Sequence, residues 1–364
     1  MTESMLQFGG GKFLRAFVDL FVEEMNHSDH PVGRVVVLQS SDSSRAEAFN
    51  SQTHYHVLIR GSQAGRVVDE TRQVHSVSRA VVAGHEWGTT LEIGRSEDLR
   101  WIVSNTTEAG LALDTAEVGA DEVGTPRSFP AKLASVLSAR YDAGAFPIQV
   151  LPCELVDRNA DLLRSLVLKQ AHTWGFARDV LDWIGDGVVW SNTLVDRIVS
   201  APPPRHPLET MDALLCAAEP FAIWAIESEE PPFAHPAVHA VSQIDAYVLR
   251  KVRILNGAHT ALVQRALGQV ETVLEAMEDA SLREWLEALM FEEIVPVVED
   301  RVEDAAGFAR ATLERFSNPY LRHRLADIAL HQEEKVKVRL IPTYEEFVHR
   351  FGRKPARLSK ALGV

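Results

Sequence analysis

The stretch Met5-Leu6-Gln7-Phe8-Gly9-Gly10-Gly11-Lys12-Phe13-Leu14-Arg15 decides the fold of this chain. Residues 5–8 are typical of a short buried strand, and after the glycines apolar side chains recur with a helical period up to residue 25. A strand, a glycine turn and a helix in this order can bring the first N–H groups of the helix against a pyrophosphate. Leu14 stands where the usual pattern has its third glycine, so a plain glycine turn is the alternative. We expect these residues to bind a dinucleotide cofactor, with Arg15 contacting a phosphate: Phe8, Gly9, Gly10, Gly11, Phe13 and Arg15.

The second strand candidate, residues 34–39, ends in a polar segment where a dinucleotide-binding fold contacts the ribose of its cofactor. An acid at this place favours NAD, whereas an arginine can accommodate the phosphate of NADP. Ser40, Asp42 and Arg45 follow the strand, without an acid directly at its end. We expect Ser40 and Asp42 to contact the cofactor and NAD to be preferred, with NADP as the alternative.

Strand and helix candidates alternate through the first two thirds of the chain. This alternation predicts an α/β fold with a Rossmann-like, doubly wound and mostly parallel sheet. The strands are expected at 55–59, 101–103 and 146–151, and the helices at 128–141 and 162–168. The polar loop after residue 103 follows the carboxyl end of a strand, where open α/β sheets bind ligands. The cofactor-binding candidates in this loop are Asn105, Thr106 and Glu108.

After residue 248 the chain changes to amphipathic helices, expected at 258–279, 282–292, 303–315 and 321–331. A chain of 364 residues exceeds the size at which one hydrophobic core keeps growing. We therefore expect two domains. Residues 1–247 would form the dinucleotide-binding domain, and residues 248–364 a mainly helical domain that contacts substrate and carries the catalytic groups.

Lys251, Asn256 and His259 stand together where the helical half begins. If this segment is helical, their side chains project within one arc of about 140°. One face could then present an amine, an amide and an imidazole to one ligand. The alternative is a basic helix start followed by an asparagine and a histidine that are buried and hydrogen-bonded to the backbone.

Two further segments carry charge that could face a ligand. Asp196 and Arg197 lie in an apolar frame, where burial is costly unless they pair with each other or with a ligand. Arg322 and His323 belong to a basic cluster that could hold a carboxylate or phosphate, with a solvated face as the alternative.

Composition limits the classes of function. With 46% hydrophobic and 24% charged residues this is an ordinary globular protein, and a net charge of −14 argues against a nucleic-acid partner. Two cysteines without a CxxC spacing favour a reduced compartment. Because the chain shows neither a signal-peptide pattern nor an uncharged apolar run of about 18 residues, we expect a cytoplasmic protein without membrane contact. The histidine pairs 27/30 and 54/56 lack companion ligands at a recognised spacing, so we expect no catalytic metal.

Several of these segments together resemble the polyol-specific long-chain dehydrogenases of the mannitol dehydrogenase family. The family pattern of Lys, four residues, Asn, two residues and His is matched by Lys251, Asn256 and His259, and its Val-Asp-Arg-Ile signature by residues 195–198. Residues 6–17, 104–110, 152–155 and 254–262 are most similar to the tagaturonate reductases of this family.

The resemblance implies an NAD-dependent, zinc-independent and reversible reduction of a keto sugar acid, of the tagaturonate to altronate type. Lys251 would act as general acid and base, Asn256 would stabilise the substrate oxygen, and His259 would orient the substrate or Lys251. It also implies a monomer or small homo-oligomer. The alternatives are a mannitol-1-phosphate, mannitol or fructuronate oxidoreductase of the same family, and a dinucleotide-sensing protein without activity. The expected substrate contacts are Glu154, Asn159, Val195, Asp196, Arg322 and His323.

Overall fold

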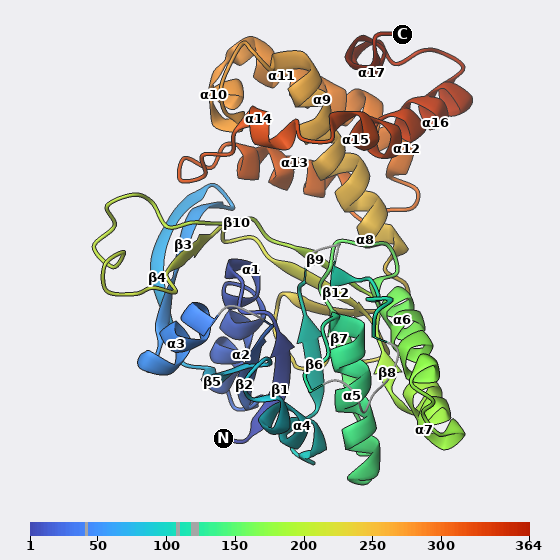
Figure 1. The fold of residues 1–364 in the computed structure, drawn as a ribbon. Helices are drawn as coiled ribbons and strands as arrows, with labels where there is room; N and C mark the ends of the chain where they lie inside the picture. The colour runs from blue at the N-terminus through green and yellow to red at the C-terminus, as the bar shows by residue number, and fades with distance from the viewer. Residues whose placement is uncertain (41–42, 107–109, 118–123) are drawn as a thin grey trace. The chain divides into compact units, whose positions relative to one another are not determined.

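In the computed structural model, residues 1–40, 43–106, 110–117 and 124–364 are described. They divide into two compact units (Figure 1). The sheet unit comprises residues 1–58, 71–218 and 222–242, and the helical unit comprises residues 59–70, 219–221 and 243–364.

The sheet unit is built on a six-stranded sheet whose paired neighbours all run parallel. Its spatial order is β5-β2-β1-β6-β7-β8. Numbered along the chain without the intervening hairpin, this is the 3-2-1-4-5-6 order of the Rossmann fold, which confirms the predicted fold class. The strands are β1 (Glu3–Phe8), β2 (Arg34–Gln39), β5 (Val77–Val82), β6 (Trp101–Ser104), β7 (Gln149–Pro152) and β8 (Val189–Trp190).

Helices cover both faces of this sheet (Figure 1). One face presents Leu6, Val36 and Ile102 to a hydrophobic core that includes side chains of α4 (Trp87–Arg95), α5 (Phe129–Asp142) and α6 (Asn159–Thr173). On the other face Gln7 reaches Asp19 of α2 (Val18–Asn26). Because both faces are covered, the strands are buried runs without polar alternation. This unit also contains α3 (Ser43–Ser51) and α7 (Arg178–Asp182), which continues into a π turn over Trp183–Gly187.

The helix predicted for residues 12–25 is interrupted. It splits into α1 (Lys12–Arg15) and α2, because Phe17 leaves helical geometry with φ −131° and ψ −91°. The hydroxyl of Tyr55 donates to the carbonyl of Arg15 at 3.2 Å, and Nη1 of Arg197 donates to the carbonyl of Ala16 at 2.9 Å. These side chains satisfy backbone groups that a continuous helix would have bonded itself.

Two smaller sheets accompany the main one. A four-stranded sheet has the order β10-β11-β3-β4 and a three-stranded sheet the order β13-β12-β9. The first contains β3 (Tyr55–Gln63), β4 (Arg66–Val74), β10 (Val199–Ser200) and β11 (Cys216–Ala218). The second contains β9 (Thr193–Asp196), β12 (Ile223–Glu227) and β13 (Val238–Val241).

The helical unit has its own hydrophobic core, in which α9 (Gly257–Ala266) contributes Ala258, Ala261 and Leu262. The helix predicted for residues 258–279 stops at Ala266 and resumes at Val273, where Thr272 and Glu275 form a capping box. The helix predicted for 321–331 is only the short α14. In the described parts of the chain, no helix combines the length and apolar character needed to span a membrane. The helices are α8 (Asp245–Arg250), α9 (Gly257–Ala266), α10 (Val273–Glu278), α11 (Ala280–Leu289), α12 (Val295–Val298), α13 (Ala305–Phe316), α14 (Leu325–Ile328), α15 (Gln332–Arg339), α16 (Ile341–Phe351) and α17 (Ala356–Leu362), with π turns at Lys251–Asn256 and Met290–Ile294.

Candidate active site

The glycine turn lies at the carboxyl end of β1, next to β6, where the strand order of the sheet reverses. Gly9 has a φ of +104°, which favours glycine, and its N–H donates to the carbonyl of Leu38 at 3.0 Å. A Cβ on Gly10 would lie 2.2 Å from Nε2 of Gln39, whereas a Cβ on Gly11 would meet nothing within 4 Å. The turn is therefore pressed against β2 on one side and open beside Gly11. This is the kind of surface that lets a pyrophosphate approach the backbone.

A buried polar network supports this turn. Nη1 of Arg15 donates to the carbonyl of Gly10 at 2.7 Å, and Nε2 of Gln7 donates to the carbonyl of Gly9 at 3.1 Å. The predicted phosphate ligand Arg15 is thus turned into the protein, with only 4% of its surface exposed. The sequence prediction missed Gln7 as part of this network, although a polar residue inside an apolar strand was a visible signal.

Asp19 completes the network and is fully buried. The Tyr55 hydroxyl donates to its Oδ2 at 2.9 Å, while Oδ1 has no hydrogen-bond partner among the described residues. Burial raises the pKa of Asp19 to about 7, although the hydrogen bonds from Tyr55 and Gln7 act in the opposite direction. The carboxyl group is consequently close to half-protonated at neutral pH.

The other predicted cofactor residues lie at strand ends. Phe8 packs against Phe129 with ring centroids 4.9 Å apart, and Phe13 stacks on Phe17 at 4.8 Å. Ser40 is exposed directly after β2. Asp42 and Glu108 lie outside the described residues.

The loop after β6 is braced by Glu154. Its carboxylate accepts hydrogen bonds from the Ser104 hydroxyl at 3.0 Å and from the Thr106 N–H at 2.8 Å, and Nδ2 of Asn105 donates to the carbonyl of Cys153 at 2.7 Å. Burial raises the pKa of Glu154 despite these hydrogen bonds. Asn105 and Thr106 are thereby held beside the glycine turn, as the backbone contact between Asn105 and Phe8 also shows.

Asn159 ties two strand ends together. Its Nδ2 donates to the carbonyls of Pro152 at 3.0 Å and Thr193 at 3.1 Å, and its Oδ1 accepts from the N–H of Thr193 at 3.0 Å. Val195 and Asp196 follow on β9, and both are buried. The structure thus gathers four of the predicted substrate residues, Glu154, Asn159, Val195 and Asp196, around the ends of β7 and β9.

In the helical unit, Lys251 and Asn256 are the first and last residues of a π turn. In an α-helix this spacing of five would separate the two side chains by about 140°. A π turn closes i→i+5 hydrogen bonds and so contains one residue more than an α-turn. The angle between residues five apart is therefore smaller than in an α-helix, which brings the amine and the amide closer to a common direction. Both residues are partly exposed.

His259 lies one turn further on, in α9, and is buried. Its ring stacks on Phe316 at 4.0 Å, and the ring of His323 meets it edge-on at 5.0 Å. Within the described parts of the chain, Nε2 of His259 has no hydrogen-bond partner. Burial, followed by the positive charges of His323 and Arg315, holds the pKa of His259 well below its usual value. The imidazole is therefore neutral, and its buried Nε2 makes no hydrogen bond to the described residues.

The two predicted basic substrate residues differ in their placement. His323 is half-buried against His259, whereas Arg322 has 75% of its side chain exposed and pairs with Glu271 at 3.3 Å. Two cations of α15, Arg339 and Lys335, also lower the pKa of His259. Arg339 donates a hydrogen bond to the hydroxyl of Thr260 at 3.3 Å. Arg315 was not predicted, because its role depends on a buried ion pair with Glu219, 96 residues earlier.

Comparison with known proteins gives matches over nearly the whole chain. Family models described as the mannitol dehydrogenase Rossmann domain and the mannitol dehydrogenase C-terminal domain match residues 3–239 and 243–363. An altronate oxidoreductase from Halalkalibacterium halodurans is 36% identical over 387 residues, covering 100% of this chain and 74% of the relative. An altronate oxidoreductase from Bacillus subtilis is 35% identical over 379 residues, covering 98% of this chain and 77% of the relative.

Two solved structures share the fold. A D-sorbitol dehydrogenase in substrate-free form matches with a TM-score of 0.86 at 22% identity, over 100% of this chain and 79% of the other. The mannitol 2-dehydrogenase of Pseudomonas fluorescens, in a ternary complex with NAD and D-mannitol, matches with a TM-score of 0.78 at 21% identity, over 100% and 78%.

Proposed function

The chain belongs to the mannitol dehydrogenase family, and from this membership we propose that it catalyses the reversible, NAD-dependent reduction of a keto sugar acid, of the tagaturonate to altronate type. The family resemblance inferred from the motifs is confirmed, and the protein is an oxidoreductase acting on CH–OH groups. The observation that carries the proposed substrate class is the name altronate oxidoreductase, which relatives at 35–36% identity over nearly all of this chain share.

The glycine turn fits a nicotinamide dinucleotide, the cofactor class of this family. Gly11 leaves open space where a side chain would stand. Arg15 and Gln7 donate hydrogen bonds to carbonyl groups of the turn. We propose that Phe8, Gly9, Gly10, Gly11 and Phe13 surround the cofactor. Arg15 would preserve the shape of the turn, and Ser40, Asp42, Asn105, Thr106 and Glu108 would be further contacts. NAD is proposed as the physiological form. When bound, it exchanges a hydride with the substrate carbon.

Lys251 and Asn256 would complete the reaction at the substrate oxygen. As the ketone is reduced, negative charge develops on its oxygen, which the amide of Asn256 stabilises with a hydrogen bond. The ammonium of Lys251 donates a proton to that oxygen and gives the alcohol; in the reverse direction the neutral amine removes the proton. The π turn supports this assignment because it leaves a smaller angle between the two side chains than an α-helix would. No metal ion is assigned a part in these steps.

His259 would position the substrate without exchanging protons. Its depressed pKa keeps the ring neutral, so a ring nitrogen can hydrogen-bond to a substrate hydroxyl. His323, in contact with His259, is the best placed of the other proposed substrate residues. Asp196 and Val195 are proposed as direct contacts and Arg322 as a peripheral one. The internal hydrogen bonds of Glu154 and Asn159 favour a supporting role for both.

The proposal is tested by NADH oxidation with tagaturonate, fructuronate, fructose and fructose 6-phosphate, before and after exhaustive chelation. We expect chelation-resistant turnover with highest kcat/KM for tagaturonate. Turnover of fructose 6-phosphate or fructose in preference to both uronates would overturn the substrate class, and NADH binding without turnover would indicate a sensor.

The role of Lys251 has its own test. Replacing Lys251 by Ala should lower kcat by roughly 10²–10⁴-fold or more, because it removes the proton donor, while NADH affinity stays within twofold. Lys337, an exposed lysine of α15, gives a matched Lys→Ala control. Full activity of the Lys251→Ala enzyme would remove this residue from the mechanism.

A further inference from the structure

Arg253 lies inside the π turn that carries Lys251 and Asn256, and its guanidinium is buried. Nη1 donates to the hydroxyl of Thr343 at 2.9 Å, and Nη2 donates to Oε1 of Glu346 at 2.8 Å. Only 11% of the Arg253 side chain is exposed. Both partners belong to α16, about 90 residues further along the chain, so one side chain joins the turn to a distant helix.

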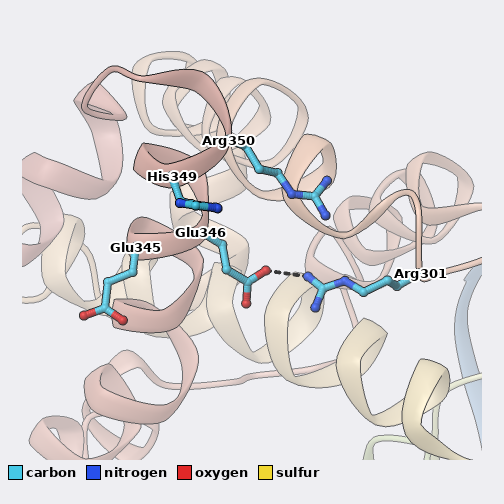
Figure 2. Close-up of a pocket in the computed structure, with 5 residues that line it drawn as sticks. All are labelled: Arg301, Glu345, Glu346, His349 and Arg350. Carbon is cyan, nitrogen blue, oxygen red and sulfur yellow. Dashed lines mark hydrogen bonds and ion pairs between the residues drawn. The ribbon is translucent and has the colours of Figure 1, made fainter.

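Glu346 is itself held from a second side. Its Oε2 accepts a hydrogen bond from Nη2 of Arg301, an interaction that Figure 2 shows across an open pocket of about 430 Å³. Burial pushes the pKa of Glu346 upward, but the hydrogen bonds from Arg301 and Arg253 outweigh this effect, and the net pKa lies below its usual value. The carboxylate is therefore charged at neutral pH and pairs with both guanidinium groups. The pocket is lined by Arg301, Glu345, Glu346, His349 and Arg350.

The turn needs such an anchor. A π turn is rare because its i→i+5 hydrogen bonds are less favourable than those of an α-helix, and it persists where surrounding contacts hold it. If residues 251–256 returned to α-helical geometry, Lys251 and Asn256 would again diverge by about 140°. Arg253 stands between these two residues in the sequence. Its guanidinium is fixed by one hydrogen bond to a hydroxyl group and one charge-assisted hydrogen bond to a carboxylate.

We propose that Arg253 is a positioning residue of the active site, which keeps Lys251 and Asn256 aligned by tying the π turn to α16 through Thr343 and Glu346. This inference rests on the proposed function, because it assumes that Lys251 and Asn256 act on the same substrate oxygen. Arg253 touches neither substrate nor cofactor in this scheme, and its effect is confined to the geometry of the two residues beside it.

The test compares four variants of the full-length enzyme with tagaturonate and NADH as the probes. Arg253→Met removes the anchor, and Glu346→Met removes its acceptor at a partly exposed site where folding is less at risk. Glu346→Gln keeps an oxygen for Arg253 and should retain more activity than Glu346→Met. Arg350→Met is the matched control, because Arg350 lies on the same helix and lines the same pocket, yet pairs with Asp300 at 2.6 Å and not with the π turn.

We expect kcat to fall by about 10- to 100-fold in Arg253→Met and Glu346→Met, while the Kd for NADH changes less than twofold. The primary isotope effect measured with 4-deuterated NADH should equal or exceed that of the wild type, since the chemical step is the one that slows. This ratio does not depend on how much of the enzyme is folded, so it separates misalignment from simple loss of protein. Arg350→Met should keep wild-type kcat.

Two results would overturn the inference. One is a kcat within twofold of the wild type in folded Arg253→Met or Glu346→Met enzyme. The other is a loss of kcat accompanied by an isotope effect that collapses toward one. Failure of the proposed function looks different, because then Lys251→Ala would retain activity. An inactive Lys251→Ala enzyme beside a fully active Arg253→Met enzyme would refute the positioning role alone.

Discussion

Replacing Asp19 by Asn should make the stability of the sheet unit less dependent on pH. Burial raises the pKa of Asp19 from 3.8 to about 7, so the folded protein holds a proton that the unfolded chain releases between these values. The stabilisation by the neutral carboxyl is therefore complete below about pH 4 and is lost as the pH rises through about 7. Asparagine resembles the neutral form and does not ionise.

The magnitude follows from the size of the shift. Each pKa unit corresponds to about 1.4 kcal/mol, so ionising the buried carboxyl costs about 4 kcal/mol once the pH is well above 7. Between pH 5 and pH 8.5 the stability of Asp19→Asn relative to the wild type should rise by about 2–3 kcal/mol. Because all other titrating groups are the same in both proteins, their contribution to the pH dependence cancels when the two unfolding free energies are subtracted.

Urea unfolding followed by tryptophan fluorescence measures this difference. Of the seven tryptophans, only Trp285 belongs to the helical unit, so the signal reports mainly on the sheet unit. Asp29→Asn is the control, because Asp29 is exposed. A stability difference that stays constant from pH 5 to pH 8.5, or that falls as the pH rises, would refute the inference that Asp19 is a buried titrating group.

Two further substitutions test the contacts described above. Gly10→Ala should lower the unfolding free energy by about 1–3 kcal/mol and weaken NADH binding, because its Cβ would lie 2.2 Å from Gln39 and 2.7 Å from Phe49. Gly11→Ala, with nothing within 4 Å, should leave the melting temperature unchanged, and equal effects of the two changes would contradict the geometry of the turn. Glu219→Gln should cost about 3–5 kcal/mol in urea unfolding followed by circular dichroism, because it removes the negative charge that pairs with the buried Arg315 guanidinium. The control Glu271→Gln removes an exposed partner of Arg322 and should cost less than about 1 kcal/mol; similar losses in both would show that burial does not decide the effect.

The sequence was sufficient to predict four strands of the main sheet, β1, β2, β6 and β7, whereas β5, which carries Ser78 and Arg79, and the two-residue β8 were not predicted. β1 and β2 are mostly apolar and almost fully buried, and the glycines after Phe8 mark the turn at the point where the strand order reverses. β4 was not predicted, because its segment Arg66–Val74 is mostly polar and exposed and carries no apolar alternation. The break at Phe17 was equally invisible, since it depends on hydrogen bonds from Tyr55 and Arg197, far away in the sequence.

The sequence indicated which residues belong to the candidate site but not the local geometry that holds them. Lys251, Asn256 and His259 were identified from their spacing, and a helix was expected from residue 258, so that it included His259 but left residues 251–257 open. The π turn was not, because its stability depends on the contacts of Arg253 with residues of α16. The inward orientation of Arg15 was missed for a similar reason: periodicity cannot tell whether a cation serves a ligand or the backbone beside it.

The helical unit is assembled from three separate stretches of the chain, and this has a consequence for its synthesis. Ser62 is translated 252 residues before Glu314, to which it is hydrogen-bonded. Glu219 is translated 96 residues before Arg315, with which it forms a buried ion pair. The helical unit therefore includes segments that are translated among the residues of the sheet unit. It cannot finish folding until α13 has also been translated. For the same reason, cutting the gene once near residue 243 would yield a carboxyl-terminal fragment that lacks the acid its buried guanidinium requires.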